Sequence, residues 1–373
     1  VNNMNESVLS FKDKYFGDKN FYKMTLTIAV PIIIQNLLTN LVSMADNIMV
    51  GQLGTNQMSG VAIINQLFFV FNLLVFGGMS GAGLFSAQYF GQKNHNGVRD
   101  VFRMKILIGI TIIAISLSVM IFLHEPLINM FLHEGSSSGN IQETFNYAKN
   151  YLYIMVIGIA PFVISNCYST TLKESGQTVV PMKAGVLAVV FDIVLNYIFI
   201  FGKLGFPAMG VVGAAIATVI SRFVECGYLV IYTHRHSNDY PFIKHCYRTL
   251  KVPGSLVKKI IVTGAPLMLN EFLWAGGLTL QTQALSTKGL ATVGGLNICN
   301  TIGNISNCIF VTMGTTIAIV VGQLLGAGKL KEAKVTATRM AAFSLLISFG
   351  MIIILGLLGL VFPHFYNTTD EIR

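Results

Sequence analysis

Nine long apolar stretches constrain this chain more than any other feature of its sequence. They lie near residues 24–50, 60–88, 104–124, 148–169, 181–201, 207–232, 257–286, 292–323 and 340–362. A bilayer has a hydrocarbon core about 30 Å thick, which roughly 20 helical residues cross. Backbone groups in lipid must pair within their own segment, and barrel strands would alternate over about ten residues, so these runs predict helices. We therefore expect an all-α integral membrane protein, a polytopic helical bundle.

Charged residues are scarce and unevenly placed along the chain. They make up 11% of the 373 residues, against about 25% in soluble domains, which excludes a soluble globular protein. Of the 25 lysines and arginines, 20 fall in loops on one side of the predicted helices and four in loops on the other. The positive-inside rule then places the N-terminus in the cytoplasm. The net charge of +9 is spread over loops that face membrane lipid, so we expect no nucleic-acid partner.

The sequence repeats itself without gaps at a spacing of 235 residues. The matched positions are special residues within or beside the apolar runs: Pro31 and Pro266, Gly54 and Gly289, Gly60 and Gly295, Asn65 and Asn300, Asn72 and Asn307, Gln88 and Gln323, and Gly91 and Gly326. Six predicted spans separate equivalent points, and an even number gives parallel repeats related by an axis along the membrane normal. We expect an N-terminal lobe of six helices at 1–232, a cytoplasmic linker at 233–256 that acts as a hinge, and a C-terminal lobe at 257–373.

The second lobe predicted by this repeat is incomplete. Residue 373 corresponds to residue 138 of the first half, so nine of an expected twelve transmembrane helices are present. We interpret the chain as C-terminally truncated, with a true nine-helix protein as the alternative.

Several short motifs support a family assignment. They are AVP at 29–31, ADNIMVG at 45–51, QYFGQ at 88–92, LKESGQT at 172–178, NYIFIFG at 196–202 and GVVGAAIAT at 210–218. In this order and spacing the chain resembles the bacterial multidrug and toxic compound extrusion (MATE) transporters over its whole length. The resemblance implies two lobes of six helices around a cleft, in the bacterial plasma membrane, and exchange of cationic or amphiphilic compounds for Na+ or H+.

Carboxylates inside the predicted spans are the main candidates for function, because ionisable groups in a membrane are costly. Asp46 matches the first-helix aspartate that the family uses for cation coupling; the alternative is a solvated residue at a helix end. Asp192 and Asn196 share one helix face, in the reverse of the order found in many family members. They can help to form a Na+ site or a proton-binding carboxyl, or they can be a hydrogen-bonded pair that only packs helices. The reversal leaves the choice between Na+ and H+ open.

The resemblance adds two polar residues to this predicted ion-coupling cluster. Thr218 matches a family position whose hydroxyl belongs to it, and Asn166 matches a fourth-helix member loosely. The alternative for Thr218 is a hydrogen bond to its own helix backbone, which is common for threonine. Any Na+ would lie at Asp46, Asp192 and Asn196.

A second polar surface is predicted on the seventh helix. Glu271 lies one turn before Trp274, the only tryptophan, so a carboxylate and an aromatic face can share one surface. That combination suits an organic cation through charge and cation–π attraction. Gln281 is the repeat mate of Asp46. We predict substrate or cation binding by Glu271, Trp274 and Gln281, with a structural carboxyl as the alternative for Glu271.

Arg222 and Glu225 are the remaining charged pair within a span. They lie three residues apart on the sixth helix, close enough to pair with each other. We expect a neutralised structural ion pair near the cytoplasmic side.

Other classes of protein lack support in the sequence. An integral membrane enzyme would need a nucleophile with its base or metal-ligand spacing, and neither GxSxG nor HExxH occurs within the predicted spans. A lipid-linked oligosaccharide flippase of the same superfamily is the closer alternative, but it would be expected to carry interior arginines, and Arg222 is the only interior cation. The five cysteines show no disulfide or zinc pattern. We expect a monomeric transporter without cofactors.

Overall fold

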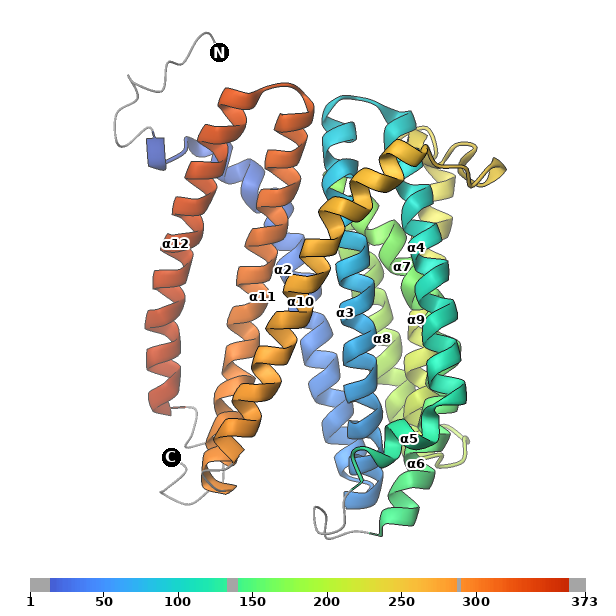
Figure 1. The fold of residues 1–373 in the computed structure, drawn as a ribbon. Coiled ribbons are helices and arrows are strands. Elements are labelled where there is room, and N and C mark those ends of the chain that lie inside the picture. The colour runs from blue at the N-terminus through green and yellow to red at the C-terminus, as the bar shows by residue number, and fades with distance from the viewer. Residues whose placement is uncertain (1–13, 133–139, 287–289, 362–373) are drawn as a thin grey trace. The chain divides into compact units, whose positions relative to one another are not determined.

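The computed structural model describes residues 14–132, 140–286 and 290–361, and Figure 1 shows long helices throughout them. The helices are α2 (Lys19–Gly51), α3 (Thr55–Gly91), α4 (His95–Phe122), α5 (His124–Asn129), α6 (Ile141–Met155), α7 (Ile159–Glu174), α8 (Val179–Phe201), α9 (Val211–Arg235), α10 (Gly254–Ser286), α11 (Leu290–Gly326) and α12 (Leu330–Val361). Three short 3-10 helices add η2 (Val156–Gly158), η3 (Pro241–Ile243) and η4 (Cys246–Arg248). The all-helical membrane fold predicted from the apolar runs is confirmed.

Eight stretches of the described chain are long and apolar enough to cross a membrane. Helix α6, the short η2 and α7 together make one of them, Ile141–Glu174. Helix α10 is long enough but falls outside this group, because its apolar run is interrupted by polar residues such as Asn270 and Glu271. Large apolar side chains face outward on many helices, for example Leu273 at 68% exposure and Ile353 at 65%, as expected for a surface covered by lipid.

The internal repeat is visible in the helix boundaries. Three pairs of helices begin 235 positions apart: α2 and α10, α3 and α11, and α4 and α12. Helices α2 and α10 are each 33 residues long and contain the matched prolines Pro31 and Pro266. Helices α3 and α11 are each 37 residues long. The repeat is therefore a repeat of structure as well as of sequence.

The matched glycines bring the ends of α3 and α11 into close contact. A Cβ on Gly91 would strike the backbone of Gln323, and a Cβ on Gly326 would strike the backbone of Gln88. The 235-residue repeat maps each of these two contacts onto the other. Glycine is required at both positions because only its missing side chain allows the two backbones to approach so closely.

The chain falls into two compact units. One contains Leu38–Ser86 and His95–Met268, and the other contains the described residues of Val1–Leu37, Ala87–Asn94 and Leu269–Arg373. The second unit has an apolar core of Phe21, Ile28, Ile32, Ile319, Val320 and Met340. This partition differs from the lobe boundaries inferred from the repeat, which stay a prediction.

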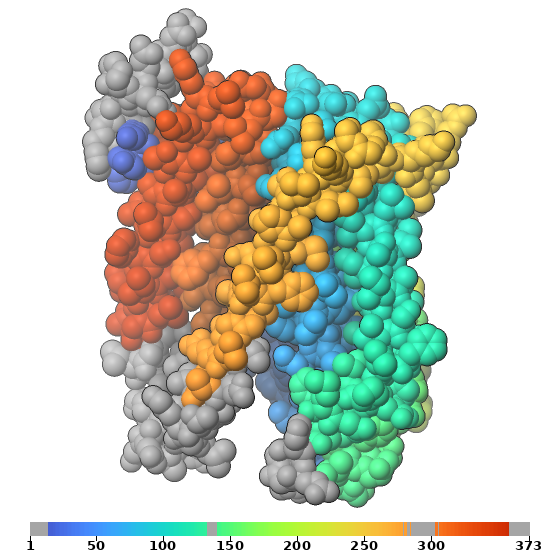
Figure 2. All heavy atoms as spheres, in the orientation of Figure 1, coloured from blue at the N-terminus to red at the C-terminus, as the bar shows by residue number. Residues whose placement is uncertain are grey.

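The linker predicted as a hinge is packed against the start of α4. Arg103 donates from Nε to the carbonyl oxygen of Cys246 at 2.9 Å and from Nη2 to that of His245 at 3.0 Å. Phe242 is buried and packs edge-on against Phe102. In Figure 2 the linker, in yellow, lies beside the teal atoms of α4. This part of the linker is therefore a docked segment rather than a free tether.

Candidate functional site

The predicted carboxylates of the first lobe meet around one amide. Asp46 lies near the end of α2, and Asp192 and Asn196 lie one turn apart on α8. Asn196 donates from Nδ2 to Asp46 Oδ1 at 2.7 Å and to Asp192 Oδ2 at 3.0 Å. Asp192 is 3% exposed and Asn196 is fully buried. The structure thus joins all three side chains in one hydrogen-bonded cluster.

Helix α9 completes this cluster with hydroxyl groups. Ser221 donates from Oγ to Asp192 Oδ1 at 3.1 Å, and its Oγ also lies 2.8 Å from the carbonyl oxygen of Thr218. The hydroxyl of Thr218 also contacts Asp192. Sequence reasoning missed Ser221, although its position three residues after Thr218 placed both on one face of the helix. We call Asp46, Asp192, Asn196, Thr218 and Ser221 the acidic cluster.

The acidic cluster has the donors and acceptors of a small-cation site. The Asn196 Oδ1 atom is buried and has no hydrogen-bond partner among the residues that the structure describes. An unpartnered buried acceptor costs free energy, about 1–3 kcal/mol, unless a ligand satisfies it. Carboxylate and amide oxygens are the ligands that hard cations prefer. The cluster can therefore hold a Na+ ion through its oxygens or a proton on one of its carboxyl groups.

A pocket of about 340 Å3 opens beside the acidic cluster. Polar or charged residues lining it are Ser43, Asp46, Asn47, Asn65, Asn72, Tyr151, Thr218 and Arg222, and apolar lining comes from residues such as Phe68 and Phe69. Asn65 and Asn72 are the α3 asparagines of the internal repeat, which the sequence singled out without a role. Tyr151 was missed entirely, because an aromatic residue in an apolar run carries no sign of the pocket it faces.

Arg222 does not pair with Glu225 as the sequence predicted. Its guanidinium lies over the rings of Phe68 and Phe162, with centroid distances of 5.4 and 5.0 Å. Within the described chain no carboxylate oxygen lies within 4.0 Å of it. A spacing of three residues allows a helical ion pair but does not require one. The expectation of a neutralised pair is therefore wrong, and Arg222 faces the pocket instead.

The structure does not join Asn166 to the acidic cluster. Its Nδ2 donates to the carbonyl oxygen of Phe162 in its own helix, α7, at 2.9 Å. Its ion-coupling role stays a prediction to which the geometry adds nothing.

The second predicted surface lies on α10, in the other unit. Trp274 is 47% exposed, Gln281 is exposed and Glu271 is half-buried. Among the described residues no ion pair involves Glu271. These three residues keep their predicted role without any contact in the structure that tests it.

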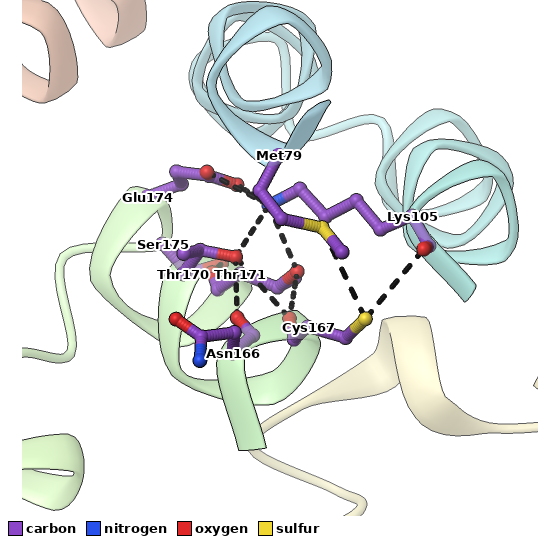
Figure 3. A network of polar contacts seen from close by, with 8 residues as sticks. All are labelled: Met79, Lys105, Asn166, Cys167, Thr170, Thr171, Glu174 and Ser175. Carbon is purple, nitrogen blue, oxygen red and sulfur yellow. Dashed lines mark hydrogen bonds and ion pairs between the residues drawn. The ribbon is translucent and has the colours of Figure 1, made fainter. Parts of the chain in front are cut away.

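Sequence reasoning also missed a buried ion pair between α4 and α7, shown in Figure 3. Lys105 is one of the 20 basic residues that the sequence assigns to the cytoplasmic side, at the start of the predicted span 104–124, and its side chain is fully buried. Its Nζ lies 2.7 and 2.6 Å from the two carboxylate oxygens of Glu174, and it donates to the hydroxyls of Thr170 and Thr171 at 3.0 and 3.3 Å. These donor–acceptor pairs satisfy the lysine, so this pair has the character of a structural contact.

The described residues hold no group of three histidine, cysteine, aspartate or glutamate side chains placed to bind a metal ion.

Comparison with known proteins identifies a matching family and several similar proteins. A family model named MatE matches residues 31–198 and 266–373. A probable multidrug resistance protein NorM from Thermotoga maritima is 30% identical over 308 residues, which are 82% of this chain and 64% of that protein. A probable NorM from Halalkalibacterium halodurans is 28% identical over 319 residues, 84% of this chain and 66% of that protein. The chain therefore spans just under two thirds of the length of these curated relatives.

Solved structures show the same fold. The chain matches a structure titled as the outward-facing conformation of a multidrug resistance MATE family transporter of the MOP superfamily with a TM-score of 0.80. The match has 19% sequence identity and covers 100% of this chain and 79% of that one. At this identity the likeness establishes the architecture alone.

Proposed function

The chain belongs to the MATE family of multi-pass membrane transporters, and we propose that it exports cationic or amphiphilic compounds in exchange for Na+ or H+. Export proceeds by alternating access, with the compound held in the pocket and the coupling ion in the acidic cluster. The observation that carries this proposal is the hydrogen-bonded set of Asp46, Asn196 and Asp192 next to a pocket of about 340 Å3.

Coupling requires that the ion and the compound affect one another. Asp46 belongs both to the acidic cluster and to the wall of the pocket. An ion bound at the cluster therefore changes the charge that the compound meets, and the compound changes the affinity for the ion by the same factor. Asp46 is the residue through which we expect this exchange to act.

The choice of coupling ion depends on the unpartnered oxygen of Asn196. A Na+ ion would be coordinated by Asn196 Oδ1 together with carboxylate oxygens of Asp46 and Asp192. A proton would instead bind one carboxyl group and would leave that amide oxygen without a partner. Na+ would satisfy this oxygen and is the ion to test first, while the carboxyl groups of Asp46 and Asp192, which also contact each other, could share the proton of the alternative.

The remaining properties of the transporter are part of this proposal. We place it in the bacterial plasma membrane with the N-terminus in the cytoplasm, because most basic loops lie on that side. It acts on small organic molecules as a monomer, without a cofactor and without an enzymatic step.

Efflux from membrane vesicles tests the function. A Na+ or pH gradient is imposed across the membrane of everted vesicles that contain the protein, and uptake of the cationic dye ethidium is followed by fluorescence. We expect a gradient of one ion to drive uptake, and Asp46→Asn to abolish it. Asp239→Asn, an exposed change in the linker, serves as the control and should keep full activity. Gradient-independent dye uptake, equal in both variants and wild type, would refute the antiport proposal.

A further inference from the structure

The pocket contains an arginine that the proposed antiport mechanism does not use. Arg222 lines it from α9, and Asp46 lines it from α2. The pocket therefore presents both signs of charge, together with the aromatic rings of Phe68 and Phe69. In a pocket for simple cations the positive charge of the arginine would oppose binding.

The guanidinium of Arg222 has few hydrogen-bond partners. It has five N–H donors, and its only hydrogen bond to a described residue runs from Nη1 to the carbonyl oxygen of Gly158 at 3.5 Å. That distance is long for an N–H···O bond, which is usually shorter than about 3.2 Å. The faces of Phe68 and Phe162 offer cation–π attraction but accept no conventional hydrogen bonds. Most of the donors of Arg222 are therefore available for a ligand.

The nearby carboxylates are engaged elsewhere. Asp46 accepts from Asn196, and Asp192 accepts from both Asn196 and Ser221. A charged group inside a membrane span usually pairs with an opposite charge, because an unpaired one is costly. The charges of Asp192 and Glu225 act on Arg222 without direct contact, because no carboxylate oxygen of the described residues lies within 4.0 Å of its guanidinium. The free N–H groups of Arg222 can therefore donate to an anionic group of a ligand as their partner.

The surroundings hold the guanidinium in position. A Cβ on Gly158 would lie 3.2 Å from Arg222 Cδ and 3.3 Å from Nη1, so a side chain there would crowd the arginine. Gly158 ends the short η2, where the helical span Ile141–Glu174 changes its pitch. Two aromatic rings flank the same group. These contacts orient the planar guanidinium group of Arg222. Two of its N–H groups can then donate to the two oxygens of a carboxylate.

We propose that Arg222 is a binding subsite for the acidic group of the transported compound. The preferred substrates of this pocket are then zwitterionic aromatic amphiphiles, with a carboxylate on Arg222, an aromatic body against Phe68 and Phe69, and a cationic group facing Asp46. This inference rests on the proposed export function and narrows its substrate class.

Two dyes that differ in a single group test the subsite. Rhodamine 19 carries a free carboxylate, and rhodamine 6G is its ethyl ester. Binding of each to the purified protein in uncharged detergent is measured by fluorescence polarisation. We expect wild type to bind the acid more tightly than the ester. Arg222→Gln should weaken binding of the acid about tenfold or more, the usual scale for a charge-assisted pair, and change binding of the ester less than about threefold.

Control variants separate the subsite from general damage. Arg235→Gln removes an exposed arginine from the same helix and should leave the ratio of the two affinities unchanged. Arg222→Lys keeps the charge but loses the planar fork, so it should give an intermediate ratio even if Arg222→Gln folds poorly. Equal affinities for acid and ester in wild type, or a ratio that Arg222→Gln and Arg222→Lys leave unchanged, would overturn the subsite while export remains possible. Failure of both dyes to bind would overturn the export proposal itself.

A lipid phosphate has the same chemistry as a substrate carboxylate, so a further arm distinguishes them. The binding assay is repeated in micelles containing phosphatidylglycerol. The proposal predicts that the preference for the acid persists. Loss of that preference in wild type, with no further change in Arg222→Gln, would assign Arg222 to a lipid headgroup and refute the substrate subsite.

Discussion

Breaking the buried ion pair of Lys105 and Glu174 should destabilise the helix packing strongly. The Lys105 side chain is fully buried, and that of Glu174 is 11% exposed. Lys105→Met leaves the carboxylate without its counter-ion in a nearly dry site, for which the expected cost is about 3–5 kcal/mol. Glu174→Met should cost a similar amount, because the lysine then keeps only two threonine hydroxyls. The double variant removes both charges, and we expect it to lie within about 2 kcal/mol of wild type.

Reversible denaturation in mixed micelles, followed by circular dichroism, measures these differences in the free energy of unfolding. The exposed pair Lys329–Glu332, with side chains 54% and 44% exposed, provides the control, and Lys329→Met should change the free energy by less than about 1 kcal/mol. If the double variant is almost as stable as wild type although each single variant is destabilised, Lys105 and Glu174 interact directly. If the two single effects simply add in the double variant, the ion pair does not contribute in the way the geometry indicates.

Three further predictions concern the linker, the repeat contact and the acidic cluster. Burial raises the pKa of the Cys246 thiol to about 11, so with the other cysteines replaced by serine it should react slowly with maleimide at pH 8 and faster as the pH approaches that value. Arg103 lowers this pKa, so Arg103→Ala should slow the reaction at pH 8 further while the linker stays docked, and a faster reaction would show that the linker has left α4. Gly91→Ala should lower the melting temperature measured by size-exclusion chromatography of heated samples, because its Cβ meets backbone, whereas Gly350→Ala, with open space around it, should not. Asp192→Asn should reduce ion-driven ethidium efflux less than Asp46→Asn does, since the bond between Asn196 and Asp46 survives; an equal or larger loss would contradict this order.

Much of the fold was predictable because membrane helices are specified by composition and length. The apolar runs placed the helices, and the repeat of 235 residues reappears in the starting residues of three helix pairs. Asp46 and Asp192 were recognisable because a carboxylate inside an apolar run has few structural explanations. These signals are local in sequence and need no knowledge of which helices touch.

The parts that were missed depend on contacts between distant segments. Lys105 looks like a loop cation until α7 supplies Glu174 as its partner. The side chain of Arg222 could pair with Glu225 or lie against Phe68 and Phe162. The packing of α3, α7 and α9 decides between these two positions. The linker sequence has no periodic hydrophobic pattern that would predict its packing against α4. Side-chain direction at these places follows from tertiary packing, which a single sequence does not display.

Ion-driven release of bound dye tests the role of the acidic cluster most directly. Purified protein with bound ethidium is titrated with Na+ at constant pH and with acid at constant Na+, and dye release is followed by fluorescence. We predict that one of the two titrations releases the dye from wild type and from Asp239→Asn, and that neither releases it from Asp46→Asn. Release from Asp46→Asn at the same ion concentration as from wild type would contradict the assignment of the coupling ion to Asp46, Asp192 and Asn196.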